Sequence, residues 1–427
     1  MPESMVVIIG TLDTKGDELK LLQAQIQQFG CKTMILDLST GGDPAFSPDI
    51  SAAQVACAAE GNLLQIQQSR DTAWGSLMMI KGAIRILTDL LKEERLGGVI
   101  GIGGASGTTM ITTIMHSLPF GLPKLAVSST AAMPEYAGRY FGTKDLVLFH
   151  SVVDISGTNT LVRDILSRAA GCMAGMVNAS SLSADLLKTA NTSSRVAMSE
   201  FKFSDYCCNY IRHALEKKGF EVIAYHAQGI GDRAMDEAIE QGLYIGVLDI
   251  VPAGLSEELL GGNRAAGKKR LEAAGKNGIP QVVTPCGFDM ISCGPLERKE
   301  KGDLLWINRR LAERKLFIPD AYRVQARTDR DELKEIARMF AEKLQYANGP
   351  VEIVIPLRGW SSLSEKDSPL YDLEADTCFL EELQRHINYN HINLTTVDAP
   401  LNNPVFAQKI VEKFLQHLQP QKTASNL

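Results

Sequence analysis

The chain has 427 residues, enough for two to three domains at roughly 150 residues each. Its 44 Lys and Arg residues against 50 Asp and Glu residues give a formal net charge of −6, which excludes a general nucleic-acid binder. The 45% hydrophobic and 22% charged fractions are those of an ordinary folded protein and exclude a mainly disordered chain.

The first 38 residues predict a β-α-β unit. Met5–Ile9 is a continuous apolar run, as expected of a strand buried on both faces, and a polar turn, Gly10–Gly16, follows it. Apolar residues then recur at helical spacing, at Leu19, Leu22, Ile26 and Phe29. A second strand is expected at Met34–Leu38, and the short connection favours a parallel pair.

The same pattern continues through the N-terminal half. A helix with Leu77, Ile80, Ile84, Leu87 and Leu91 on one face leads into a strand at Gly98–Ile102. Further strands are expected at Pro123–Ser128 and Leu146–Phe149, followed by a helix at Asn159–Val177. The small, polar stretch Thr189–Ser194 is typical of a domain boundary.

A second series of alternating elements follows the boundary. Its expected strands are Val196–Ser199, Glu221–His226, Tyr244–Ile250, Gln281–Pro285, Val351–Leu357 and Asn393–Val397. Helical patterns lie between most of them. We therefore predict two Rossmann-like, doubly wound α/β domains with mostly parallel sheets, at residues 1–190 and 195–420, with a cleft between them.

A glycine-rich turn after the Gly98–Ile102 strand is the first candidate phosphate site. Its candidate residues are Gly103, Gly104, Ser106, Gly107, Thr108 and Thr109. Glycines let the backbone approach an anion, and the hydroxyl groups add donors at the start of the next helix. The turn departs from the dinucleotide fingerprint because Ser106 stands at the third glycine position. A tight strand-to-helix turn without a ligand is the alternative.

The turn after the first strand is the second candidate. Lys15 could neutralise a phosphate, while Asp13 could hold Mg²⁺ or accept from a ribose hydroxyl. Asp13 could instead be only the N-cap of the helix, the commoner role for Asp at this position. The predicted nucleotide-binding set from this turn and from two strand ends is Thr11, Asp13, Thr14, Lys15, Asp37 and Ser128.

The second half offers weaker candidates. The turn Gly229–Ala234 fits G-x-G-x-x-A between a strand and a helix, with Asp249 near the place of a ribose-binding acid. Against dinucleotide binding there, Asp232 would place a carboxylate beside a pyrophosphate. His226, Asp249 and Arg358 are candidate substrate contacts in a cleft. No G-x-S-x-G or H-E-x-x-H motif occurs, so no catalytic residue is predicted.

Cysteine usage and apolar runs bear on the compartment. Eight cysteines are too few for a disulfide scaffold, and no C-x-x-C pair occurs. Cys286 and Cys293 are expected to be buried, neutral thiols. No run of 18 apolar residues predicts a membrane span, and the first apolar run is too short for a signal peptide. We therefore expect a cytoplasmic protein with reduced thiols and no membrane partner.

Seven motifs, in order, resemble one family. They are Gly10–Gly16, Gly101–Gly104, Gly121–Lys124, Ser151–Asp154, Gly278–Val283, Pro356–Gly359 and Tyr371–Asp376. The chain is similar over essentially its whole length to the poorly characterised family that includes the ATP-binding N-terminal half of the tomato tobamovirus-resistance protein. The resemblance implies two Rossmann-like domains, ATP binding in the first and self-association. The plant relative inhibits a viral replication protein by binding it.

The chain departs from this family in its second half. The segments Val251–Gly254, Ile318–Ala321 and Pro400–Pro404 replace polar groups that the family typically carries. The leading hypothesis is therefore an ATP- and Mg²⁺-binding module of the cytoplasm, a homo-oligomer with a possible protein partner. An ATP-dependent enzyme acting on a small molecule in the cleft is the alternative, and a dinucleotide-dependent oxidoreductase is the third reading.

Overall fold

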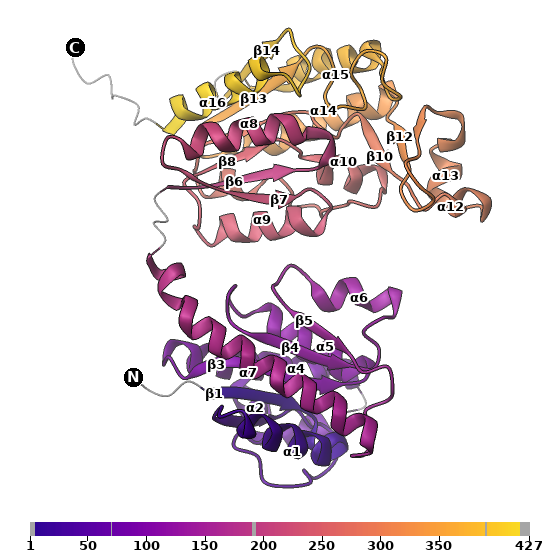
Figure 1. Ribbon diagram of the computed structural model, residues 1–427. Helices are drawn as coiled ribbons and strands as arrows, with labels where there is room; N and C mark the ends of the chain where they lie inside the picture. The colour runs from indigo at the N-terminus through magenta and orange to yellow at the C-terminus, as the bar shows by residue number, and fades with distance from the viewer. Residues whose placement is uncertain (1–4, 70, 190–193, 389–390, 419–427) are drawn as a thin grey trace. The chain divides into compact units, whose positions relative to one another are not determined.

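The computed structural model describes residues 5–69, 71–189, 194–388 and 391–418 (Figure 1). By its internal contacts the chain divides into an N-terminal unit, Met1–Ala190, and a C-terminal unit, Asn191–Leu427. Residues 190–193, within the expected boundary, lie outside the described residues. Each unit contains one main sheet of parallel strands, so the expected α/β fold class is confirmed.

The N-terminal unit is built on a sheet whose neighbouring strands are all parallel. The strands are β1 (Met5–Gly10), β2 (Thr33–Asp37), β3 (Leu96–Gly103), β4 (Lys124–Ser128) and β5 (Val147–His150). They lie in the order β2-β1-β3-β4-β5, and all five were expected from the sequence. The order reverses between β1 and β3, and such a switch point is where open parallel sheets bind ligands.

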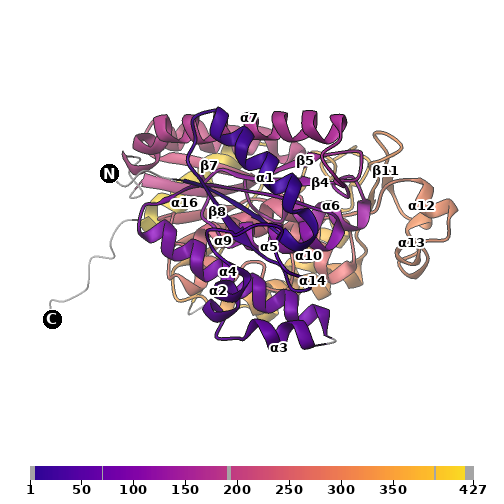
Figure 2. The same cartoon turned by 90° about the horizontal axis from the view of Figure 1, so that it is seen from below.

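Helices cover both faces of this sheet. They are α1 (Leu12–Gln28), α2 (Ala52–Ala58), α3 (Leu63–Gln68), α4 (Thr72–Lys92), α5 (Ala105–His116), α6 (Pro134–Phe141) and α7 (Thr160–Thr189). Val6 and Ile8 pack toward α1 and α7, whereas Val7 and Ile9 pack toward α2, α4 and α5 (Figure 2). Successive side chains of a strand point to opposite faces, so β1 must be apolar throughout.

The C-terminal unit repeats this plan with one more strand. Its main strands are β6 (Arg195–Glu200), β7 (Glu221–His226), β8 (Gly246–Asp249), β9 (Gln281–Val283), β13 (Val351–Pro356) and β14 (Ile392–Val397). They lie in the order β14-β13-β9-β8-β6-β7, and every pair is parallel. The switch point lies between β6 and β8. In each unit, therefore, the first strand in the chain lies between the second and the third: β1 between β2 and β3, and β6 between β7 and β8.

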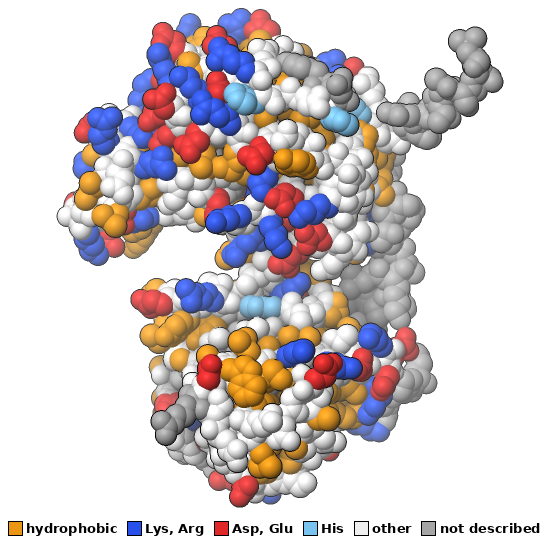
Figure 3. All heavy atoms as spheres, turned by 180° about the vertical axis from the view of Figure 1, so that it is seen from behind, with side chains coloured by type: hydrophobic (Ala, Val, Ile, Leu, Met, Phe, Trp, Pro, Cys, Tyr) orange, Lys and Arg blue, Asp and Glu red, His pale blue; other side chains and the backbone are white. Residues whose placement is uncertain are grey.

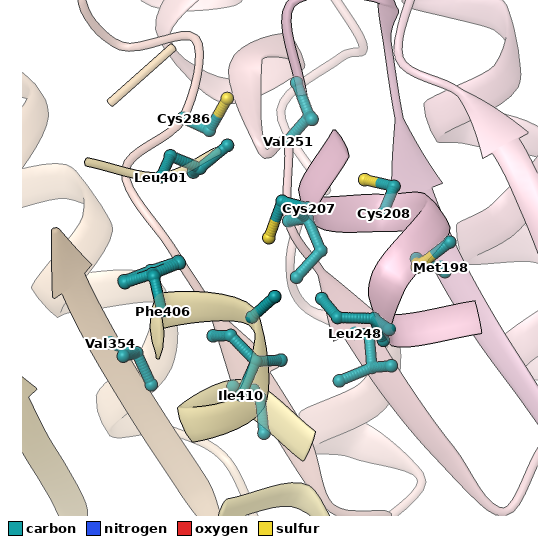
Figure 4. Packing of buried hydrophobic residues seen from close by; sticks show 14 of the residues in the cluster. Met198, Cys207, Cys208, Leu248, Val251, Cys286, Val354, Leu401, Phe406 and Ile410 are labelled. Atoms are coloured by element: carbon teal, nitrogen blue, oxygen red, sulfur yellow. The ribbon is translucent and has the colours of Figure 1, made fainter. Parts of the chain in front are cut away.

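Two helical layers enclose the second sheet. Its helices are α8 (Asp205–Glu216), α9 (Ile230–Glu240), α10 (Ala253–Leu260), α11 (Ala273–Lys276), α14 (Arg330–Gln345), α15 (Leu373–His386) and α16 (Pro404–Leu418). Helices α8 and α16 pack on one face of the sheet. The core on this face is rich in sulfur (Figure 4). Burial raises the pKa of Cys208 and of Cys293 to about 12, and it also raises the pKa of Cys286 well above its ordinary value. Cys286 and Cys293 are thus protonated thiols, as expected.

A small antiparallel sheet was not expected from the sequence. It joins β10 (Met290–Ser292), β12 (Gln325–Arg327) and β11 (Leu316–Phe317), with the short helices α12 (Glu297–Glu300) and α13 (Leu304–Asn308) between β10 and β11. Strands of two or three residues are too short to show the alternation that predicts a strand. This insertion separates β9 from β13 in the chain.

The first turn also differs from expectation. The Gly10–Gly16 stretch is mostly helical, because α1 begins at Leu12, and its N-cap is Thr11. The interpretation of Asp13 as the N-cap is therefore wrong. Lys15 has φ −131° and ψ 22°, so the first turn of α1 is irregular at this residue.

Candidate functional site

The glycine-rich turn lies at the switch point of the N-terminal unit, between the end of β3 and the start of α5. A Cβ atom on Gly103 would lie 2.7 Å from the backbone N of Thr108 and 2.8 Å from the carbonyl carbon of Gly107. Neither backbone atom can move aside without unwinding the first turn of α5. Residue 103 must therefore be glycine for the chain to turn directly from the strand into the helix.

The start of α5 carries no side-chain cap. Its N-cap is Gly104, whereas α2, α3 and α4 are capped by the side chains of Ser51, Asn62 and Asp71. The first N–H groups of an α-helix have no intrahelical partner, and together with the helix dipole they attract an anion. Helix α6 also begins without a side-chain cap, at Met133, so α5 is distinguished by an uncapped start that lies at the switch point.

The hydroxyl groups of the turn divide into two kinds. Thr108 is buried, and its Oγ1 donates to Ser128 Oγ at 2.8 Å and to Gly103 O at 3.1 Å. Thr109 is exposed, but its Oγ1 donates to the Ala105 carbonyl at 2.9 Å. Ser106 is exposed in the first turn of α5. Thr108 and Ser128 therefore hold the turn, and Ser106 is the predicted hydroxyl best placed to contact a ligand.

The start of α1, on the other side of the switch point, is already occupied. Asp37 Oδ1 accepts from the backbone N–H groups of Leu12 at 3.1 Å and Ser39 at 2.9 Å. The N–H of Asp13 donates to Ser39 Oγ at 3.0 Å. Asp37 is 1% exposed, so this predicted nucleotide-binding carboxylate caps α1. Sequence reasoning missed Ser39, although it directly follows a strand end.

Asp13 has one engaged and one free carboxylate oxygen. Oδ2 accepts from the N–H groups of Gly41 at 3.2 Å and Gly42 at 3.0 Å, while Oδ1 is buried without a hydrogen-bond partner. The hydroxyls of Thr11 and Thr14 lie 2.7 Å apart beside it. Among the described residues, no group of three or more His, Cys, Asp or Glu could hold a metal ion by itself. A single free carboxylate oxygen fits Mg²⁺ only where phosphates supply further ligands.

Lys15 and Glu18 fasten α1 to the segment after β5. Lys15 Nζ donates to the Ile155 carbonyl, and Glu18 Oε1 accepts from the Gly157 N–H at 2.5 Å. An ammonium group has three donors, so this contact leaves Lys15 two for other partners. The structure therefore brings Thr11, Asp13, Thr14 and Lys15 together in one turn, with Lys15 directed toward residue 155.

A buried arginine fills the switch point of the C-terminal unit. Arg270 is 1% exposed, and its guanidinium lies 2.6 Å from Asp249 Oδ2, 3.0 Å from Asp232 Oδ1 and 3.4 Å from Asp236 Oδ1. Asp249 Oδ1 also accepts from Ser199 Oγ at 2.7 Å. These contacts tie the ends of β6 and β8 to α9. Sequence reasoning missed Arg270 because it lies in an irregular segment far from any strand end.

Three carboxylates around one guanidinium leave an excess of negative charge. Burial, together with the charges of Asp249 and Asp232, raises the pKa of Asp236 to about 7 against the opposing effect of Arg270. The carboxyl group of Asp236 is therefore partly protonated near neutral pH. This group is a structural ion-pair network with no open donor for a phosphate.

The Gly229–Ala234 turn is closed by the chain itself. The N–H of Gly229 donates to Asp232 Oδ2 at 2.8 Å, while Gly229, the N-cap of α9, offers no side-chain acceptor to the first N–H groups of the helix. A Cβ atom on Gly229 would lie 2.8 Å from the Ala265 carbonyl oxygen and 3.0 Å from that of Arg264. Backbone therefore lies where a pyrophosphate would approach. This geometry argues against dinucleotide binding at the turn.

The three predicted substrate contacts lie along one edge of the second sheet but not together. His226 ends β7, Asp249 ends β8, and Arg358 follows β13. Since β7 and β13 are four strand spacings apart, His226 and Arg358 are separated by roughly 19 Å at about 4.8 Å per spacing. Asp249 is buried in the Arg270 network. Arg358 is exposed and forms a two-bond ion pair with Asp398.

The surface agrees with the near-balanced charge. On the face in Figure 3, Lys and Arg side chains lie among Asp and Glu side chains, without a continuous basic surface. Among the described residues, no helix combines the length and the apolarity that crossing a bilayer requires.

Comparisons with known proteins cover both units. Models of the uncharacterised protein family UPF0261 match residues 4–182 (N-terminal domain) and 193–418 (C-terminal domain). A UPF0261 protein of Clostridium tetani is 33% identical over 97% of this chain and 99% of its own length. The ToMV resistance protein Tm-1(GCR237) of Solanum lycopersicum is 31% identical over 96% of this chain, which spans 55% of the tomato protein.

Among solved structures, the UDP-N-acetylglucosamine 2-epimerase of Rickettsia bellii has a TM-score of 0.22 and 12% identity, over 66% of this chain and 79% of that one. This likeness is too weak to carry an argument. The family models and the relatives agree with the resemblance that the motifs suggested. The chain belongs to the UPF0261 family.

Proposed function

We propose that the N-terminal unit binds ATP with Mg²⁺ at the start of α5, as a binding or regulatory module of the cytoplasm. The observation that carries the proposal is the uncapped α5 at the β1–β3 switch point, entered through a glycine that no other residue can replace. The N–H groups of the first turn and the Ser106 hydroxyl would bind phosphate oxygens. Thr108 and Ser128 would keep the turn in shape.

Asp13 and Lys15 supply the charges of this site. Mg²⁺ would neutralise phosphate charge, with Asp13 Oδ1 as its protein ligand, because that oxygen is buried and has no hydrogen-bond partner. Lys15 would contact phosphate with the donors that the Ile155 carbonyl leaves free. Asp37 would have an indirect role, because its carboxylate holds the start of α1.

Ligand-dependent stability tests the proposal. A ligand at 100 times its Kd stabilises the folded state by about 2.7 kcal/mol, so thermal unfolding with millimolar ATP and Mg²⁺ should shift upward. The shift should be smaller when EDTA replaces Mg²⁺. With ATP and Mg²⁺, it should also be smaller in Asp13→Asn than in the wild type. Unchanged melting of the full-length protein at millimolar ATP and Mg²⁺ would sink the proposal.

An ATP-dependent enzyme acting on a small molecule is the second candidate. Lys15 favours it, since an ammonium group beside a phosphate can also stabilise charge developing during transfer. Steady phosphate release that Lys15→Ala abolishes would support the enzyme. Retention of ATP without turnover would support the module. Native mass spectrometry would report subunit number and co-purified nucleotide together, which tests the proposed homo-oligomer.

A further inference from the structure

A second polar site lies in the C-terminal unit, outside the switch point. It consists of Asp289, Arg327, Ser361 and Asp376, which we call the Arg327 cluster. Asp289 follows β9, Ser361 follows β13, Arg327 ends β12, and Asp376 lies in the first turn of α15. Two of the family-like motifs, Pro356–Gly359 and Tyr371–Asp376, end at or beside it, and the proposed nucleotide site uses neither.

All four side chains are buried. Their exposed fractions are 0% for Asp289, 4% for Arg327, 0% for Ser361 and 6% for Asp376. Ser361 Oγ donates to Asp289 Oδ2 at 2.6 Å, and Arg327 Nη2 donates to Asp376 Oδ1 and, at 3.2 Å, to the Asp372 carbonyl. The cluster thus joins the ends of two neighbouring main strands to the small antiparallel sheet and to α15.

Three polar atoms of the cluster have no partner. They are Arg327 Nε, Arg327 Nη1 and Asp376 Oδ2, and all are shielded from solvent. A buried polar group without a hydrogen bond costs about 1–3 kcal/mol, and more when it is charged, so native proteins rarely leave several together. The guanidinium donors require acceptors, and the carboxylate oxygen requires a donor. A molecule that completes the site must offer both.

The charges of the cluster select among such molecules. Asp376 pairs with the guanidinium of Arg327, and the charges of Asp289 and Asp372 lie close enough to add to the negative potential at Asp376. Burial raises the pKa of Asp376 to about 6, and Arg327 opposes this, so the group is mostly ionised at neutral pH. An anionic ligand would meet a net negative site. A neutral molecule with several hydroxyl groups meets no such penalty, because each hydroxyl both donates and accepts.

We propose that the Arg327 cluster binds a small neutral polyol, whose neighbouring hydroxyl groups accept from Arg327 and donate to Asp376. Aromatic side chains adjoin the cluster in the chain: Phe288, Trp360 and Phe379, with ring centroids 5.8 Å apart for Phe288–Phe379 and 4.9 Å for Trp360–Phe379. These rings exclude water and strengthen hydrogen bonds to a bound hydroxyl group. Because the unpaired atoms are buried, entry of the ligand requires local opening.

Calorimetric titration of the full-length protein tests the site, after long incubation to allow entry. The probes are erythritol, D-threitol and xylitol, with butane-1,4-diol as the matched compound that lacks the two inner hydroxyl groups and malate as the anionic comparison. Saturable binding of a polyol, without binding of butanediol or malate, supports the proposal. Both Arg327→Gln and Asp376→Asn should weaken that binding at least about tenfold, as expected for the loss of a charged hydrogen bond.

The control variant is Arg358→Gln, which removes an exposed arginine from the same strand end and should leave polyol binding unchanged. Asp376→Asn keeps the shape of the side chain, so it alone decides if Arg327→Gln does not fold. Three results would overturn the proposal: no binding of any of the three polyols, equal binding by wild type and both variants, or binding of malate in place of the polyols. In the first two cases water alone completes the cluster, and in the third an anion does.

Discussion

The two switch points of this protein share one topology and differ in what lies there. In the N-terminal unit the chain turns from β3 into α5 through glycines and leaves the helix start uncapped. In the C-terminal unit the corresponding place, between β6 and β8, holds Arg270 among Asp232, Asp236 and Asp249. The strand order alone therefore does not make a ligand site. What differs is the side chains at the strand ends, which in the C-terminal unit form a buried ion network.

The contrast also explains why the charge of the chain is uninformative about ligands. A phosphate at α5 would rest mainly on N–H groups and a hydroxyl, with Lys15 as the proposed ammonium contact. Arg270, at the other switch point, already pairs with three carboxylates. Variants at each switch point test whether the N-terminal one binds a ligand and whether the C-terminal one serves only to stabilise its unit.

Removing the buried arginine should have the largest effect. Arg270→Met leaves three carboxylates without their cation, and breaking a buried ion pair from one side costs about 3–5 kcal/mol. The loss should be confined to the C-terminal unit. In a Trp74→Phe background the remaining tryptophans, Trp306 and Trp360, lie in that unit, so their fluorescence reports its denaturant unfolding.

The matched control for this loss is Arg358→Gln, since the exposed ion pair of Arg358 with Asp398 should contribute little. Equal unfolding midpoints for Arg270→Met and Arg358→Gln would show that the network does not hold the switch point together.

The protonation of Asp236 should give the next largest effect. Because burial raises its pKa to about 7, the folded unit holds a proton that the unfolded chain, with an ordinary Asp pKa, has lost. The contribution of Asp236 protonation to the free energy of unfolding is therefore fully present at acid pH, and it decreases as the pH rises from about 4 through 7. Asp236→Asn has no such proton, so it should equal wild type near pH 4 and exceed it at pH 8.

Three pKa units correspond to roughly 4 kcal/mol, so a gain of roughly 2–4 kcal/mol is expected for Asp236→Asn at pH 8. Urea unfolding of both proteins from pH 4 to 8 measures it. A constant difference across this range would mean that Asp236 titrates in the folded unit as it does in the unfolded chain.

In the N-terminal unit, closing the glycine turn should have a moderate effect. Gly103→Ala places a methyl group 2.7 Å from the Thr108 nitrogen and should destabilise this unit by about 1–3 kcal/mol and abolish the proposed nucleotide binding. Gly104→Ala is the matched control for stability, because the nearest atom to its Cβ is 3.9 Å away. Thermal unfolding with and without ATP and Mg²⁺ separates the two. Similar losses in both variants would contradict the steric argument.

The sequence predicted the strands better than the site. Every main strand was expected, and the central ones were recognisable because a strand covered on both faces, such as β1, must be continuously apolar. Contacts from remote loops could not be recognised in the same way. Nothing local to Asp37 shows that its carboxylate caps α1, and nothing near Arg270 shows that three carboxylates converge on it. Thr108 and Ser106 look alike in sequence, yet one is buried and the other exposed.

The smallest effect on stability should accompany a clear effect on binding, at Ser106. Its side chain is exposed, so Ser106→Ala should change the free energy of unfolding by no more than about 0.5 kcal/mol. If the hydroxyl donates to a phosphate oxygen, its loss removes a charge-assisted hydrogen bond of about 1.5 kcal/mol, and the Kd for ATP with Mg²⁺ rises about tenfold.

Thr113→Ala is the control, since Thr113 is exposed on the same helix and its hydroxyl donates to the Thr109 carbonyl at 2.6 Å, two turns from the helix start. Calorimetric titration of ATP and Mg²⁺ into both variants measures the difference. Equal affinities would remove Ser106 from the site and leave only the backbone of α5 to distinguish the two switch points. A tenfold difference in Kd without a change in the free energy of unfolding would show that the switch point of the N-terminal unit is a binding site.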